Sequence, residues 1–178
     1  HWELQFADIF KDRGGFDLTL GNPPWIKLEW KEAGLISDYR PEFVIKKLSA
    51  SATAELRNDV LEDRTIRNAY LDEYVNMTGE KAFLNASCNY AILKGSQANL
   101  FKCFLPVAWA NASPTGVSGF VHPEGVYDDP KGGRIRREAY RRLRYHFQFA
   151  NALHLFSDVH SETRFSINIY GKPFDAPQ

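Results

Sequence analysis

A short apolar run between turn-forming residues is the feature that most restricts the fold of this chain. Residues 16–20 read Phe-Asp-Leu-Thr-Leu; they follow Gly14-Gly15 and lead directly into Gly21-Asn22-Pro23-Pro24-Trp25. Such a run predicts a buried strand of a parallel sheet. In sheets of this kind, functional residues follow the carboxyl ends of the strands. We therefore expect the residues from Asn22 to Trp25 to form part of a site.

Most of the middle of the chain has helical periodicity. Residues 41–84 predict two or more helices, because apolar residues recur there at helical spacing. A further helix is expected from about Gln97 to Asn111, with Pro106 bending it or ending its first part. Its inward side chains would be Leu100, Phe101, Phe104 and Ala108.

The last third of the chain alternates between strand and helix patterns. Residues 117–121 follow the turn-forming Pro114-Thr115-Gly116 and predict a second buried strand, and 128–133 predict a loop. A helix is expected over 134–147, with one apolar stripe of Ile135, Ala139, Leu143 and Phe147. Strands at 149–155 and 165–170 would close the chain as an antiparallel pair. The fold class is therefore α/β, with a mixed sheet, an antiparallel closing strand and a helical insertion at about 41–84.

Composition narrows the classes of function. With 178 residues, of which 44% are hydrophobic, the chain can bury one core. Its 22 basic and 22 acidic residues balance, so contact with nucleic acid would need a local basic patch. Cys88 and Cys103 have neither disulfide-framework nor zinc spacing, and the dispersed histidines give no metal-ligand set. No segment has membrane-spanning or signal-peptide character, so we expect a cytoplasmic protein without a membrane partner. A start at His1 rather than methionine suggests an excised fragment.

The corner after the first strand has two interpretations. Asn-Pro commonly initiates turns, and Trp25 could simply cap a core. The context favours function, because Phe-Asp-Leu-Thr-Leu-Gly leads straight into Asn22-Pro23-Pro24-Trp25 at a predicted strand end. Here the sequence resembles motif IV of the amino-methyltransferases, and among these the N6-adenine-specific DNA methyltransferases. The resemblance extends to the large enzymes of restriction-modification and phage-defence systems.

This resemblance implies a fold, a donor and a set of roles. The fold would be a partial Rossmann-like methyltransferase fold, with residues 1–178 as the C-terminal part of the catalytic domain. S-adenosylmethionine would donate the methyl group to an adenine flipped out of double-stranded DNA. Asn22 and the Pro23 carbonyl would accept hydrogen bonds from the adenine amine, the rigid Pro23-Pro24 pair would hold the corner, and Trp25 would stack on the base.

Further segments match the same family. Residues 97–101, 119–123 and 164–169 resemble the helix after the corner, the next strand and loop, and the closing strand. The family places a second aromatic wall for the base just before the closing strand, where Phe156 fits best and Phe165 is the alternate. Asp8 matches an acidic residue that binds the adenosyl amine in some relatives. An exposed acidic residue between strands is the competing interpretation of Asp8.

Six arginines lie between positions 134 and 144. We expect Arg134, Arg137 and Arg141 to contact DNA phosphates, because the guanidinium fork suits phosphate oxygens. The alternative is a solvated helix face, or ion pairs with the acidic loop at Asp128-Asp129. The remaining members of the cluster are Arg136, Arg142 and Arg144.

Other functions remain open at this point. Protein-glutamine and RNA methyltransferases also use Asn-Pro-Pro-aromatic corners, although usually with tyrosine or phenylalanine in place of Trp25. A non-catalytic nucleic-acid-binding or assembly module is the alternative from a different class. No glycine-rich donor turn follows a predicted strand, since Gly14-Gly15 precedes a strand and Gly132-Gly133 precedes a helix. We therefore expect the chain alone to be inactive, to need the remainder of the methyltransferase, and to self-associate through an exposed sheet edge.

Overall fold

The structure is a computed structural model that describes residues 1–96 and 99–175. Two compact units make up the chain. One comprises His1–Lys27 and Leu84–Gln178 and holds the sheet, so we call it the sheet unit. The other, Leu28–Phe83, is entirely helical among its regular elements and is called the helical unit.

A four-stranded mixed sheet forms the centre of the sheet unit. Its spatial order is β1-β2-β4-β3. The first two strands are parallel, and β4 runs antiparallel to both of its neighbours. This confirms an α/β fold with a parallel pair and an antiparallel closing strand. The strands are β1 (Phe16–Gly21), β2 (Ala112–Pro123), β3 (Leu143–Ala150) and β4 (Arg164–Tyr170).

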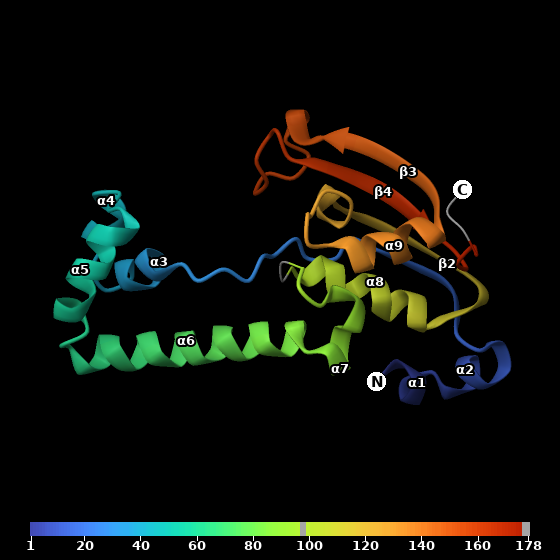
Figure 1. Cartoon of the computed structure of the whole chain (residues 1–178), viewed down its shortest axis with the longest axis horizontal. Coiled ribbons are helices and arrows are strands. Elements are labelled where there is room, and N and C mark those ends of the chain that lie inside the picture. Colours follow the sequence, from blue (N-terminus) through green and yellow to red (C-terminus); the bar gives the residue numbers. More distant parts are fainter. Residues whose placement is uncertain (97–98, 176–178) are drawn as a thin grey trace. The chain divides into compact units, whose positions relative to one another are not determined.

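Two helices cover one face of this sheet (Figure 1). Helix α8 (Leu100–Ala110) follows Asn99, whose side chain accepts a hydrogen bond from the Phe101 amide and caps the helix. The Phe101 ring stacks on His122 of β2. Helix α9 (Gly133–Arg142) buries Ile135 and Ala139 fully, as its predicted apolar stripe requires. Phe101, Ile135 and their neighbours therefore form the core between helices and sheet.

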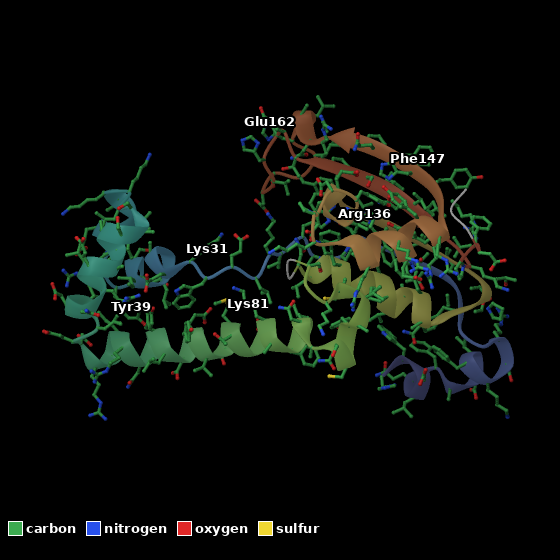
Figure 2. The ribbon with its side chains drawn as sticks, in the orientation of Figure 1. Lys31, Tyr39, Lys81, Arg136, Phe147 and Glu162 are labelled. Carbon is green, nitrogen blue, oxygen red and sulfur yellow. The ribbon has the colours of Figure 1, made fainter. Side chains whose placement is uncertain are left out.

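The opposite face of the sheet is open among the described residues. Tyr145, Phe147 and Phe149 of β3 alternate with polar residues and are exposed, together with Ile167 of β4. Phe147 points away from α9 and its Arg136 (Figure 2). We call this surface the open face; its exposed members are Tyr145, Phe147, Phe149 and Ile167.

The first strand is exposed rather than buried, which corrects the sequence prediction. Leu18 and Leu20 are 59% and 68% exposed, although β1 pairs in parallel with β2 as expected. Apolarity and length predicted the strand itself correctly. Burial depends on neighbours, and β1 lies at an edge of the sheet, where the described chain places no further strand.

Short helical elements complete the sheet unit. Helix α2 ends at Gly14 in the left-handed region, and Gly15 follows at φ +143°. A Cβ at Gly15 would stand 2.5 Å from the Asn111 carbonyl oxygen, so only glycine allows β1 to begin this close to the start of β2. The short elements are α1 (Trp2–Gln5), α2 (Ala7–Arg13), α7 (Ser87–Tyr90), η1 (Ala91–Leu93), η2 (Glu124–Val126) and η3 (Asn151–Leu153).

The helical unit has its own small core. Ile36, Phe43 and Val60 are buried together, with Leu48, Ile66 and Tyr70 packed against them. Glu32 accepts hydrogen bonds from both Arg57 and Tyr70 and links three helices. The prediction of two or more helices is confirmed, and the unit begins earlier than residue 41. Its helices are α3 (Glu32–Ser37), α4 (Glu42–Ile45), α5 (Ala50–Val60) and α6 (Arg64–Asn85), the last ending in the sheet unit.

Two predicted boundaries near the end of the chain are wrong. The helix expected over 134–147 ends at Arg142, and Leu143 and Phe147 belong to β3. The strand expected over 149–155 lies instead at Leu143–Ala150. Residues 143–149 fit both an i, i+4 stripe and a strict apolar-polar alternation, and the aromatic side chains at alternate positions favour the strand.

Three smaller expectations also change. Strand β2 begins at Ala112, so Pro114-Thr115-Gly116 lies within the strand, next to an irregularity in the β1 pairing, rather than in a turn. Helix α8 continues through Pro106, and Phe104 on it is exposed. Gln97 and Ala98, where that helix was expected to begin, lie outside the described residues.

Candidate acceptor site

The Asn-Pro-Pro-Trp corner lies directly after β1. Gly21 is the last strand residue, and the two prolines that follow Asn22 carry no backbone N–H with which to continue the ladder. Pro23 is buried, whereas Asn22 and Pro24 are exposed. The chain therefore leaves the sheet at a rigid point, with Asn22 exposed.

Asn22 and Pro23 have free hydrogen-bonding capacity. Neither the Asn22 side chain nor the Pro23 carbonyl bonds to any residue in the described part of the chain. Both residues also line a cavity of about 690 Å³ beside the exposed edge of β1. An unpaired carboxamide and an unpaired carbonyl next to a cavity can bind donors from a ligand.

The cavity beside Asn22 is mainly apolar. Phe104, Val107 and Phe120 line it, together with Leu20 of β1. Cys103 also lines it, and burial raises the pKa of its thiol to about 11, so this thiol is neutral near pH 7 and is not a nucleophile. The cavity thus offers apolar contact and few charges.

Trp25 meets the two predicted aromatic residues. Its Nε1 donates to the Val121 carbonyl oxygen at 3.3 Å, which fixes the indole against the end of β2. The Phe156 ring lies 4.6 Å from the Trp25 ring, centroid to centroid, and the Phe165 ring lies 5.8 Å away. Phe156 and Phe165 meet edge to face at 5.1 Å. The structure therefore brings Trp25 together with two residues that are far from it in the sequence.

This aromatic cluster is closed. Two rings that sandwich a flat base stand about 7 Å apart, because each face needs a contact distance near half of that. The Trp25 and Phe156 centroids are only 4.6 Å apart, with a 49° angle between the rings. A base must therefore displace the Phe156 ring before it can lie between the two.

A buried polar network lies on the other side of the same strand end. His122 Nδ1 is 2.8 Å from the Pro123 carbonyl oxygen and must donate to it, so Nε2 is an acceptor. Tyr170 and Asn168 both reach this nitrogen, at 2.9 and 3.0 Å. Tyr127 donates to the Asn168 oxygen. Burial lowers the pKa of His122 to about 4, so the imidazole is neutral and holds β2 to β4.

The six arginines differ in whether their guanidinium groups bond to other parts of the described chain. Arg134 and Arg137 are exposed and make no hydrogen bond or ion pair with the described part of the chain. Arg141 is partly buried; it donates to the Phe174 carbonyl at 3.0 Å and pairs with Glu138. Internal partners also hold the other three: Arg136 bonds to the Tyr127 and Asp129 carbonyls, Arg142 to Glu138, and Arg144 to the Lys172 carbonyl.

The structure also corrects two details of the arginine prediction. Arg144 lies in β3 rather than on the helix that carries the others. The carboxylate that the cluster uses is Glu138 rather than the Asp128-Asp129 side chains, and hydrogen bonding from Arg142 holds the pKa of Glu138 below its usual value. Of the six arginines, only Arg134 and Arg137 therefore keep a guanidinium that has no partner in the described part of the chain.

Asp8 lies apart from the corner. It is exposed in the first turn of α2, so it is not between strands, and it is absent from the lining of the cavity beside Asn22. The structure therefore does not place Asp8 near the corner, and its binding to the adenosyl amine stays a prediction.

Sequence reasoning missed Asn151. This residue is fully buried between β3 and the segment that carries Phe156, and its side chain bonds to the backbone of that segment. The available signal was one carboxamide within the apolar run Phe149-Ala150-Asn151-Ala152-Leu153. A polar group at such a place needs partners if it is buried.

Comparison with protein-family models, curated proteins and solved structures finds no match to this chain. Among the described residues, no group of three or more His, Cys, Asp or Glu side chains is placed to hold a metal ion. Within the same residues, no helix is long and apolar enough to cross a membrane.

Proposed function

We propose that this chain forms the acceptor site of a DNA methyltransferase that modifies the exocyclic amine of adenine. One observation carries the proposal: Asn22-Pro23-Pro24-Trp25 follows the carboxyl end of a parallel strand, with Trp25 against Phe156 and Phe165. Ligands of open α/β sheets bind at such strand ends. Two unpaired acceptors and, directly after them in the sequence, an indole suit a flat base that carries an amine, although Trp25, Phe156 and Phe165 do not line the cavity beside Asn22.

The chemistry of the amine explains why acceptors are needed. The lone pair of an exocyclic amine is delocalised into the purine ring, so the nitrogen is a poor nucleophile. Hydrogen bonds to the Asn22 oxygen and the Pro23 carbonyl would bind both amine hydrogens and favour a tetrahedral nitrogen. Because neither acceptor has a partner in the described chain, no internal hydrogen bond must break first. Positioning is then the main contribution of the corner.

Trp25 would hold the base in this scheme. A base inside a duplex cannot reach the corner, so the target adenine must leave the stack. The indole is fixed by its hydrogen bond to Val121 and offers a flat face on which a purine can lie. Phe156 would become the opposite wall after its ring moves aside, and Phe165 supports both rings from the sheet.

The described residues fit a methyl donor less well than they fit the acceptor base. The resemblance implies S-adenosylmethionine, whose ammonium group and ribose hydroxyls need hydrogen-bond acceptors. The cavity beside Asn22 has no carboxylate in its lining, and Asp8 is not part of it. The described residues therefore do not make a donor site, and the proposal for this chain concerns the acceptor alone.

Methyl transfer by the protein in its natural reading frame tests the proposal. The protein is given labelled S-adenosylmethionine with DNA, RNA or a glutamine-containing peptide. We expect label on DNA adenine, and we expect Asn22→Ala to lower the rate roughly a hundredfold while donor binding stays nearly unchanged. Asn76→Ala, on the exposed surface of α6, is the matched control.

Three results would contradict this function. The first is full turnover by the Asn22→Ala variant. The second is label only on RNA or only on the peptide, since other methyltransferases share this type of corner. The third is wild-type protein that binds DNA and methylates nothing, which would indicate a binding module.

A further inference from the structure

The segment between β3 and β4 carries Phe156, and a single side chain organises it. We propose that Asn151 is a positioning residue that fixes the backbone of Phe156, so that the Phe156 ring can close against Trp25 and reopen for the base. This inference rests on the proposed function, because it gives the Trp25–Phe156 contact a role in binding the acceptor base.

All the polar atoms of the Asn151 side chain are used on this segment. Nδ2 donates to the Phe156 carbonyl at 2.9 Å and to the Val159 carbonyl at 2.8 Å. Oδ1 accepts from the Phe156 amide at 3.1 Å. The residue is 0% exposed, so none of these bonds competes with water. One buried carboxamide therefore holds both backbone groups of Phe156.

Apart from the packing of the Phe156 ring on Trp25 and Phe165, apolar burial gives this segment little other support. Leu153 and Leu155 are both largely exposed, and Phe156 itself is only partly buried. His154, between them, adopts the left-handed region at φ 50°, which is uncommon for a residue with a side chain. The backbone path is therefore maintained mainly by hydrogen bonds, and Asn151 supplies three of them.

The arrangement separates the motion of the ring from that of the backbone. The closed Trp25–Phe156 distance of 4.6 Å requires the Phe156 ring to move when a base enters. Because Asn151 holds the N–H and C=O of Phe156, the ring can rotate about its side-chain bonds while its Cα stays in place. A rotamer change is fast and costs little compared with rebuilding a loop. Asn151 thus holds the Phe156 backbone in one position while the Phe156 ring remains free to rotate.

Asn151→Asp is the sharpest test, because it keeps the size of the side chain. The carboxylate can still accept from the Phe156 amide, but it cannot donate and it faces two carbonyl oxygens. We expect kcat/KM for methylation to fall about tenfold, because the wall is misplaced in the transition state. The control is Ser157→Ala, an exposed hydroxyl on the same segment.

A double-mutant cycle distinguishes positioning from general destabilisation. Asn151→Asp is measured alone and in a Phe156→Ala background. If Asn151 acts through Phe156, the second substitution removes its effect, and the double variant methylates at the rate of Phe156→Ala alone. If the two losses multiply instead, Asn151 contributes only to stability and the proposal is overturned.

Hydrogen exchange gives a measurement that does not depend on methylation. The Phe156 amide should be protected in the wild-type protein and should exchange at least about tenfold faster in Asn151→Leu, which removes the acceptor of this amide, whereas β4 amides stay protected. Unchanged protection of the Phe156 amide overturns the role of Asn151, whatever the enzyme does. Wild-type protein that shows this protection but transfers no methyl group to any acceptor contradicts the proposed function, and with it the role in base binding.

Discussion

The buried histidine of β2 predicts how the stability of the chain depends on pH. His122 is 0% exposed, and the single lone pair of its Nε2 lies within hydrogen-bond distance of two donors, the Tyr170 hydroxyl at 2.9 Å and the Asn168 amide at 3.0 Å. Protonation would place a charge in the core and remove that acceptor. The pKa of His122 is lowered by burial from 6.5 to about 4. The unfolded chain therefore takes up this proton at a higher pH than the folded chain does.

The sign and size of the effect follow from linkage. The stability that depends on neutral His122 is fully present above pH 6.5 and is lost as the pH falls towards 4. The whole difference corresponds to about 3 kcal/mol, and about 2 kcal/mol of it is lost by pH 5. Between pH 7.5 and 5, the salt-bridged Glu138 contributes little to the slope, because its pKa is held below 4.5.

Urea denaturation at pH 7.5 and pH 5, followed by circular dichroism, measures this loss. His122→Gln should be less stable than wild type at pH 7.5 and should show a much smaller change between the two pH values. His154→Gln, which removes an exposed histidine, should keep the wild-type change. Equal pH dependence in wild type and His122→Gln, or a histidine resonance assigned to His122 that titrates near 6.5, would refute the reasoning.

Three further predictions concern other parts of the chain. Replacing Arg134 and Arg137 with glutamine should reduce the salt slope of DNA binding by about one unit per lost phosphate contact. Arg141→Gln should mainly lower stability, because the Arg141 guanidinium donates to the Phe174 carbonyl. An unchanged salt slope in the first variant would show that Arg134 and Arg137 are solvated surface residues. Gly15→Ala should destabilise the fold by about 2 kcal/mol or more in thermal unfolding, since both its φ and the nearby Asn111 carbonyl exclude a Cβ; a wild-type melting temperature would show that the turn can adjust. Residues 1–178 alone should show no micromolar binding of S-adenosylmethionine in calorimetry, because no glycine-rich turn follows a described strand; tight stoichiometric binding would show that the donor site has been misplaced.

Local sequence patterns correctly predicted the strand that precedes the site and the corner that follows it. The first strand, its glycine boundaries and the corner after it lie where the sequence placed them, because glycine and proline restrict the backbone within a few residues. The strand at 165–170 and its antiparallel pairing are also confirmed. Strict alternation over Phe165 to Tyr170 predicted the strand and a short connection favoured antiparallel pairing, but not the buried face: Ser166 and Asn168 are 0% exposed, whereas Ile167 is 39% exposed.

Properties that depend on distant neighbours were less predictable. The exposure of Leu18 and Leu20 depends on what covers β1, which its own sequence cannot specify. The boundary between α9 and β3 was misplaced because the same side chains satisfy two periodicities. The role of Asn151 depends on the path of a segment that follows it, and a single carboxamide does not reveal that path.

The aromatic cluster shows what the sequence could predict and what it could not. Phe156 was selected by its position before the closing strand, and the structure places it against Trp25. Its closed geometry and its attachment through Asn151 required three-dimensional coordinates. Sequence therefore identified which residues meet, whereas the structure showed how they are held.

Nucleoside analysis of methylated DNA tests the central claim most directly. Protein in its natural reading frame is incubated with unmethylated DNA and S-adenosylmethionine, and the DNA is then digested and analysed by mass spectrometry. We predict N6-methyladenine as the product with wild-type protein and almost none with Asn22→Ala. A methyl group on another base, or equal N6-methyladenine from both proteins, would contradict the assignment of the Asn22 corner as the site that holds the adenine amine.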